Sequence, residues 1–369
     1  MRVVGRIGLT VVVLAALLLV APSATASSGV IGAVYTATND AAGNAVLQYD
    51  RLGDGSLQYA TSYGTDGQGT GGGLGNQGGV VLSDNGRWLL VVNAGSNDVS
   101  VFAIGKQGLS LVDTQYSGGT QPVSVAIHGD LVYVVNAGDD TISALRLDNH
   151  GKLTLLPGSS TPLSGVGTGP AQVGFSPDGK FVLVTEKATN LIAVFPLDGD
   201  GYAGPGVFNV SEGPTPFAFA FGKRDQLFVS EVGGGAGGGA VSSYQLLGDG
   251  TLETIAASVP NFETAPCWLV ITKGGRYVFT ANTPDDSLSA YAIEFDGELS
   301  LIDPDGKTGE PGAGTLPLDM DLSNDGRHLY TLNIGNGTIS TFRVEPDGSL
   351  TETSTVAGVP SGVNGLAAR

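Results

Sequence analysis

The sequence predicts an all-β fold, a seven-bladed β-propeller of four-stranded antiparallel blades whose ring is closed by the N- and C-terminal strands. An apolar strand that ends in a polar residue recurs at a spacing of about 50 residues, which is typical of propeller blades, and seven copies are present. Glycine accounts for 59 of the 369 residues. Because no segment repeats apolar residues at the helical period of about 3.6, helices are not expected.

The seven copies define the blades. Turns rich in Asp, Asn and Gly, such as 83–86, precede several of them, and Gly-x-Leu turns, such as 55–57, follow several. These residue types supply the dihedral angles of tight turns, so each repeat is predicted to hold four strands, named a to d. The recurring strands occupy residues 34–39, 90–93, 132–136, 182–186, 227–231, 277–282 and 330–333.

The two ends predict how the ring closes. The chain begins on a second strand, 34–38, and stops on a first strand, 363–368. Pairing these strands would complete the seventh blade and remove two exposed sheet edges. Residues 27–369 are therefore expected to form one propeller domain.

Residues 1–26 are interpreted as a signal peptide. Arg2 and Arg6 precede an apolar run over residues 7–20, and the small residues of 24–26 fit a cleavage site. The run is shorter than the roughly 20 apolar residues of a membrane span. An uncleaved anchor is the alternative, whereas cleavage predicts a secreted protein without membrane insertion.

The charge balance argues against nucleic acid as a partner. The chain has 35 acidic and 17 basic residues, a net charge of −18, and loss of the two leader arginines would make it −20. Such an acidic protein repels phosphate backbones, although its charge favours solubility and could reflect bound cations. Cys267 is the only cysteine, so no internal disulfide is expected.

Strand alternation sorts the connections onto two faces. Because successive antiparallel strands reverse direction, the b–c and d–a loops share one face, called the loop face. The a–b and c–d turns share the opposite side, called the turn face. The loop face carries the longer and more varied segments, so a ligand is expected there.

The segment Gly169–Lys180, with the sequence GPAQVGFSPDGK, and the count and closure of the repeat resemble the seven-bladed lactonase-type propellers. That family includes bacterial 6-phosphogluconolactonases, fungal carboxymuconate cyclases and the wider YVTN-like repeat proteins. The resemblance covers nearly the whole mature chain and implies the propeller fold. For the enzymes of the family, it also implies a catalytic set of one His, two Arg and one Glu on the loop face.

Most of that catalytic set is absent. The family's Pro-His falls on Pro122-Val123, its Gly-Pro-Arg-His on Gly169-Pro170-Ala171-Gln172, and its Asn-Arg on Asn282-Thr283. Glu186 is the one residue that matches. General acid–base chemistry near neutral pH most often uses histidine. The three histidines are instead expected on the turn face: His128, His150 and His328.

Glu186 is the candidate catalytic residue, as a general base or a metal ligand. Glu186 and Glu231 replace the Asn that other blades carry at the end of the second strand, which would place two carboxylates in one sector of the pore. The alternative is a hydrogen-bonded strand-end residue. No arginine is predicted there to clamp a phosphate, so a cationic or polyhydroxylated ligand is favoured over a phosphosugar. The candidate ligand-binding residues at the loop-face mouth of the pore are Glu231, Gln172, Gln121, Asn282, Trp268 and Lys187.

Three further features have weaker implications. Oxygen atoms of the strand-end Asn side chains and of Asp319 suit Ca²⁺, although such Asn residues more often bond loop backbone, and no other cofactor is evident. Cys267 has no histidine at hand and is expected to be a buried structural residue. The glycine runs 69–75 and 233–239 are expected to be flexible loops because no helix follows them, and the first leads into Asn76-Gln77 beside the pore.

Two functions are therefore carried forward. The first is a secreted, non-catalytic propeller that binds a small molecule, a glycan or a protein on its loop face. The alternative is a lactone hydrolase or cycloisomerase that acts through a reduced site around Glu186. Whether the protein is an enzyme is left open, and no oligomeric state is predicted.

Overall fold

The computed structural model describes residues 1–2 and 29–369. The predicted signal peptide therefore lies outside the described residues, apart from Met1 and Arg2. Strands dominate the described part of the chain, and its single helix is a 3-10 turn at Thr283–Asp285. No helix among these residues is long and apolar enough to span a membrane.

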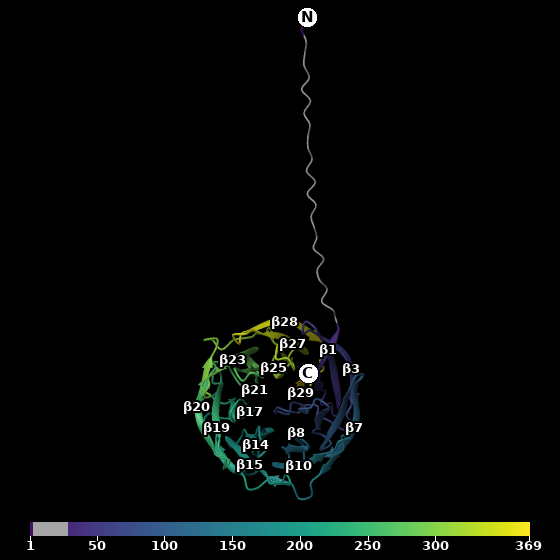
Figure 1. The fold of residues 1–369 in the computed structure, drawn as a ribbon, viewed down its shortest axis with the longest axis vertical. Coiled ribbons are helices and arrows are strands. Elements are labelled where there is room, and N and C mark those ends of the chain that lie inside the picture. Colours follow the sequence, from purple (N-terminus) through teal and green to yellow (C-terminus); the bar gives the residue numbers. More distant parts are fainter. Residues whose placement is uncertain (3–28) are drawn as a thin grey trace.

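Seven antiparallel sheets are arranged as blades around a ring (Figure 1). Each blade has four strands in the order a to d from the centre to the rim, and blade 3 has one additional short strand. This architecture confirms the predicted all-β seven-bladed propeller. The a–b connections are short, because Asp, Asn and Gly residues of the sequence form tight turns at several of them.

The blades are numbered in chain order. Blade 1 contains β29 (Asn364–Ala368), β1 (Val30–Ala37), β2 (Ala45–Leu52) and β3 (Leu57–Gly64). Blade 2 contains β4 (Val80–Leu82), β5 (Trp88–Asn93), β6 (Asp98–Gly105) and β7 (Gly108–Tyr116). Blade 3 contains β8 (Pro122–His128), β9 (Leu131–Asn136), β10 (Thr141–Leu147), β11 (Leu153–Leu155) and β12 (Thr161–Pro162).

The remaining blades repeat this plan. Blade 4 contains β13 (Pro170–Phe175), β14 (Phe181–Glu186), β15 (Leu191–Pro196) and β16 (Val207–Val210). Blade 5 contains β17 (Pro216–Phe221), β18 (Gln226–Glu231), β19 (Ala240–Leu246) and β20 (Leu252–Pro260). Blade 6 contains β21 (Pro266–Ile271), β22 (Tyr277–Asn282), β23 (Ser287–Ile293) and β24 (Leu299–Leu301). Blade 7 contains β25 (Pro317–Leu322), β26 (His328–Asn333), β27 (Thr338–Val344) and β28 (Leu350–Ala357).

Blade 1 is built from both ends of the described chain. Strand β29 pairs antiparallel with β1, with Val34 opposite Ala368 and Ala37 opposite Asn364. The predicted closure is confirmed: β29 covers the inner edge of β1 and becomes the innermost strand of the blade. In Figure 1 the C-terminal end lies inside the ring, beside the innermost strands.

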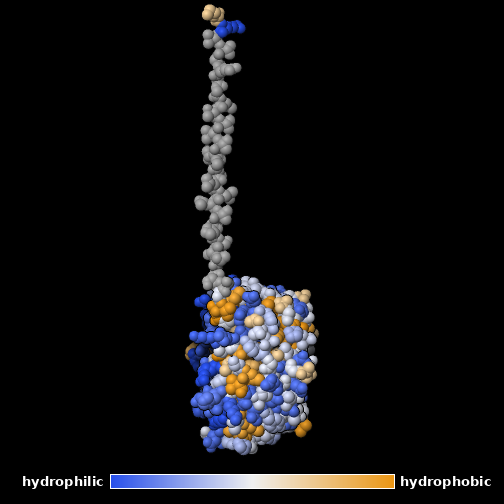
Figure 2. Space-filling view, turned by 90° about the vertical axis from the view of Figure 1, so that its right-hand side faces the viewer, coloured by the Kyte–Doolittle hydropathy of each residue, from blue (hydrophilic) through white to orange (hydrophobic). Residues whose placement is uncertain are grey.

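The hydrophobic core lies between the blades. Its clusters combine residues of neighbouring sheets; Tyr35 of blade 1, for example, packs in one cluster with Phe102 of blade 2. Tyrosines of second strands also reach the next blade: the Tyr133 hydroxyl donates to the Gly201 carbonyl at 2.9 Å, and Tyr330 donates to Gly55 at 3.0 Å. The outer wall in Figure 2 is mostly hydrophilic, with small hydrophobic patches.

The recurring strand-end Asn residues have a structural role. Asn93, Asn136, Asn282 and Asn333 are all fully buried. Each Nδ2 donates to a serine hydroxyl on the neighbouring third strand, as from Asn333 to Ser340 at 2.9 Å. These bonds fix the b–c connection and satisfy polar groups that would be costly to bury unpaired.

We expect Leu366→Ala to destabilise the ring by about 2–4 kcal/mol, because it leaves a cavity in the closing strand. Leu366 is buried in a cluster with Val34 and Tyr330, which joins blade 7 to blade 1. Urea unfolding measures the effect, with the exposed Leu247→Ala as a matched control that should change little. Equal losses in the two variants would show that the β29–β1 closure does not govern stability.

Candidate ligand-binding site

The segment Asn76–Gly78, which precedes β4, crosses the loop-face mouth of the ring. The Asn76 side chain donates to the Val123 carbonyl of blade 3 and accepts from Asn364 of blade 1 at 2.7 Å. The Asn76 carbonyl accepts a hydrogen bond from Trp268 Nε1 of blade 6 at 2.9 Å. The polypeptide itself therefore occupies much of the mouth in which a ligand is predicted.

Gln77 completes this crossing. Its Nε2 donates to the Leu269 carbonyl at 2.9 Å, its Oε1 accepts from the Leu269 amide at 3.0 Å, and its own amide donates to Ala171 at 3.1 Å. One residue of blade 2 thus joins blades 4 and 6. The glycine run 69–75 leads into this segment, and no helix follows it, as expected.

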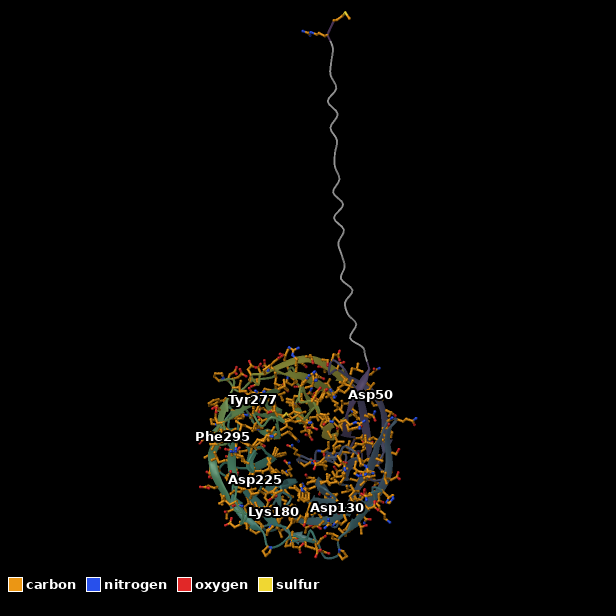
Figure 3. The ribbon with its side chains drawn as sticks, viewed as in Figure 1. Asp50, Asp130, Lys180, Asp225, Tyr277 and Phe295 are labelled. Carbon is orange, nitrogen blue, oxygen red and sulfur yellow. The ribbon has the colours of Figure 1, made fainter. Side chains whose placement is uncertain are left out.

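A cavity of about 710 Å³ fills the central channel behind Gln77. Its walls come from the innermost strands of all seven blades, and side chains extend from these strands toward the middle of the ring in Figure 3. The cavity reaches the turn face, where its lining includes the exposed residues Asp84, Pro177 and Asn324. A volume of this size is typical of small-molecule sites.

Two carboxylates of β25 line this channel, Asp319 and Asp321. Asp321 accepts hydrogen bonds from the amides of Leu322 and Ala368, each at 2.8 Å. Burial raises its pKa to about 6 against the opposing effect of these bonds and of Lys273. Burial also raises the pKa of Asp319 well above its usual value, and the negative charge of Asp321 adds to that rise.

Glu186 lies fully buried at the end of β14. Its oxygens accept hydrogen bonds from the Ser164 amide at 3.1 Å, from the Ser164 hydroxyl, and from the Thr189 hydroxyl at 2.7 Å. All three donors belong to connecting segments of the loop face. These contacts fit the alternative interpretation of Glu186, as a hydrogen-bonded residue at the end of a strand. Glu186 does not line the channel cavity.

Glu231, its counterpart in blade 5, is buried in the same way. Its Oε1 accepts from the Gly213 amide at 2.8 Å and from the Ser211 and Ser242 hydroxyls, whereas Oε2 has no hydrogen-bond partner. Glu231 therefore bonds the d–a connection that precedes its blade and the third strand, β19. Among the described residues, no three His, Cys, Asp or Glu side chains cluster so as to hold a metal ion. The Ca²⁺ site stays a prediction.

Lys187, Cys267 and Trp268 lie near one another at the loop-face end of the channel. Lys187 Nζ donates to the Gly75 carbonyl and lies 5.0 Å from the ring centre of Phe217, which in turn packs at 5.4 Å against Trp268. Burial lowers the pKa of Lys187. Burial raises the pKa of Cys267 to about 11, against the opposing effects of Thr283 and of the charge of Lys187, so the thiol is protonated at neutral pH.

The other predicted residues are dispersed. Gln172 lines the channel, but both ends of its amide bond the Phe219 backbone, at 3.0 and 2.7 Å. Asn282 is held by Ser289 and Asn261, and Gln121 is exposed on a loop. Of the predicted site residues, Gln172 alone lines the cavity.

Asp321 was not identified as a site residue from the sequence, because a single acidic residue inside a strand matches no recognisable motif. Its spacing of two residues from Asp319 does indicate that both side chains lie on the same side of β25.

The histidines lie where the sequence predicted, at turns of the turn face. His128 lines the channel at its turn-face end and packs at 5.6 Å against Phe175. His328 is buried, and burial lowers its pKa. None of the three faces Glu186.

Comparisons with known proteins agree with this architecture. The family described as "Lactonase, 7-bladed beta-propeller" matches residues 42–166. The 6-phosphogluconolactonase of Pectobacterium atrosepticum is 22% identical over 276 residues, which cover 71% of this chain and 78% of that protein. The periplasmic gluconolactonase of Pseudomonas aeruginosa has a TM-score of 0.68 at 17% identity, covering 90% of this chain and 98% of that one. A Lactobacillus plantarum protein gives 0.72 at 17% identity, covering 92% and 100%.

The fold and the channel define a closed seven-bladed propeller with a polar axial cavity. Within that class, the chain is similar to the lactonase propellers and to 6-phosphogluconolactonase. The structural neighbours, all at low identity, support the fold alone.

Replacing Asp321 with Asn is expected to stabilise the protein above pH 6. The pKa of Asp321 is raised from 3.8 to about 6 in the folded state, so folding favours the protonated carboxyl group. The folded state therefore has its full stability below pH 3.8 and loses part of it as the pH rises through 6 and Asp321 becomes charged. The variant should exceed wild type by about 1–2 kcal/mol at about pH 7.5 and match it at about pH 3.5. Urea unfolding at several pH values measures this difference.

Asp249→Asn is the control of opposite sign. Hydrogen bonds from Thr251 lower the pKa of the exposed Asp249, so its variant should be the less stable one at neutral pH. If Asp321→Asn also lowers the free energy of unfolding at neutral pH, the charged carboxylate of Asp321 does not destabilise the folded state, and the prediction is wrong.

Proposed function

We propose that this protein is a non-hydrolytic propeller that binds a small molecule in its central channel. One observation carries the proposal: a cavity of about 710 Å³ that is bounded by Gln77 toward the loop face and contains the carboxylates of Asp319 and Asp321. The loop-face site predicted from the sequence is less favoured, because Asn76 and Gln77 occupy that mouth.

The absence of a hydrolytic mechanism is inferred from three positions. Val123 and Ala171 stand where the resemblance implies His and Arg, and neither offers an acid–base group. Glu186 is fully buried, and its oxygens already accept bonds from Ser164 and Thr189. A general base must reach the reacting proton within hydrogen-bond distance, directly or through one water, and Glu186 does not line the cavity.

The lining of the channel favours a cationic or polyhydroxylated ligand. Carboxylates accept hydrogen bonds from ammonium and hydroxyl groups and attract positive charge. Lys273 is the one Lys or Arg side chain among the lining residues, so no pair of guanidinium groups is available to hold a phosphate. A neutral or cationic sugar suits this cavity better than a phosphosugar.

Lactone hydrolysis or cycloisomerisation is the alternative function. It is supported by the similarity to the 6-phosphogluconolactonase of Pectobacterium atrosepticum. Export is proposed from the leader-like sequence pattern, together with the likeness to a periplasmic gluconolactonase. A protein or glycan partner on the loop face also stays a proposal, while the net charge of −18 disfavours nucleic acid.

In calorimetric titrations, we expect D-glucosamine to bind more tightly than D-glucose, and glucose 6-phosphate to bind least. Asp321→Asn should weaken glucosamine binding about tenfold, because it removes a charge that faces the ligand. Asp249→Asn, which removes a carboxylate from an exposed turn, is the matched control and should leave binding unchanged. Preferential binding of glucose 6-phosphate, or a glucosamine affinity that does not respond to Asp321→Asn, would refute the channel assignment.

A lactone screen separates the two functions. Wild-type protein should hydrolyse glucono-δ-lactone no faster than the spontaneous reaction, because the family's catalytic His and Arg are missing and the matching Glu186 is fully buried. Turnover above that background that disappears in Glu186→Gln would establish the hydrolase instead. The same assay on Asp321→Asn reports whether any turnover arises in the channel.

A further inference from the structure

A second cavity, of about 730 Å³, lies between blades 1 and 2, apart from the channel. Strands β1, β2 and β3 form one wall, and the turn Gly105–Gly108 of blade 2 forms the other. Asp50, which lines it, is labelled in Figure 3 on the blade 1 side of the ring. Asn324 is the one residue that lines both this cavity and the channel.

The lining of this cavity is positively charged in an otherwise acidic protein. Arg51, Arg369 and Lys106 supply three cationic side chains, against the Asp50 side chain and the terminal carboxylate of Arg369. Asp325 lies outside the lining, with its carboxylate 3.7 Å from Arg51 Nη1, and offsets part of that charge. Against a chain charge of −18, this concentration of cations favours an anionic occupant.

Two buried donors in this lining have no hydrogen-bond partner. Arg51 is 4% exposed, and although its Nε donates to the Arg369 carbonyl at 3.0 Å, its Nη1 has no acceptor within bonding distance. Arg369 Nε is likewise buried without an acceptor. Gly32 permits this arrangement, because a Cβ there would lie 2.7 Å from Arg51 Nε. Buried unpaired donors are rare in folded proteins, so they point to an absent acceptor.

One acceptor is also left unpaired. Gln48 Nε2 donates to Asp50 Oδ1 at 2.9 Å, and since a carboxylate can only accept, this bond fixes the orientation of the amide. Gln48 Oε1 is then buried without a donor. The cavity therefore lacks both an acceptor for its arginines and a hydroxyl donor for Gln48.

We infer that this cavity binds a small hydroxy acid with two carboxylates. The carboxylates satisfy the free donors of Arg51 and Arg369. A ligand hydroxyl donates to Gln48 Oε1. The inference is independent of the proposed channel function.

Malate and succinate form a matched pair of probes, since they differ by one hydroxyl group, and glycerol carries hydroxyls without charge. In calorimetric titrations of the full chain, malate should bind about tenfold or more tightly than succinate, and glycerol should not bind. Arg369→Gln should weaken both dicarboxylates about tenfold, whereas Arg369→Lys should lose less, because it keeps the charge but not the guanidinium donors. Arg276→Gln, an exposed arginine outside the cavity, is the control and should change neither affinity.

Gln48→Leu tests the acceptor separately, because it should abolish the preference for malate while leaving succinate binding intact. Thermal melting of each variant without ligand verifies that it is folded. Asp321→Asn should leave malate binding unchanged, so the failure of one site is distinguishable from failure of the other. The inference is overturned if wild type binds no dicarboxylate at millimolar concentration, or if malate binds Arg369→Gln and Arg276→Gln equally well.

Discussion

The backbone pairing of β29 with β1 is the interaction on which the ring depends. Each of the other blades is a continuous stretch of chain, whereas blade 1 must be assembled from segments more than three hundred residues apart. The single cysteine leaves no internal disulfide to secure this joint. Hydrogen bonds along the two strands, and the hydrophobic cluster around Leu366 and Tyr330, therefore maintain the closed ring.

The closed ring in turn determines which polar groups can act. Glu186 and Glu231 stand in the same strand-end position as the asparagines of other blades, and like them they are buried and hydrogen-bonded to neighbouring segments. The carboxylates of β25 differ, because the innermost strand faces the axis and offers no adjacent loop to neutralise them. The raised pKa of Asp321, at about 6, is the electrostatic result of that position.

The sequence determined the fold more fully than the site. Seven copies of one strand pattern, with tight turns at fixed offsets, were enough to predict blade number, strand order and closure, since each depends on local periodicity. The course of Asn76–Gly78 was not predictable in this way, because its partners Val123, Ala171 and Leu269 lie in three other blades. The pocket around Arg51 and Arg369 was missed for the same reason: its residues meet only through closure and contact between blades.

The position of the closing strand has a consequence for biosynthesis. As the chain emerges from the ribosome, six blades can complete their hydrogen bonding in order, but β1 waits with an unpaired edge until β29 has been made. Strand β29 also carries Asn364, which holds the Asn76 crossing, and it contributes to the channel wall. The axial cavity and its loop-face boundary are therefore incomplete in a nascent chain. Until β29 has been added, the unpaired edge of β1 can pair with a strand of another chain.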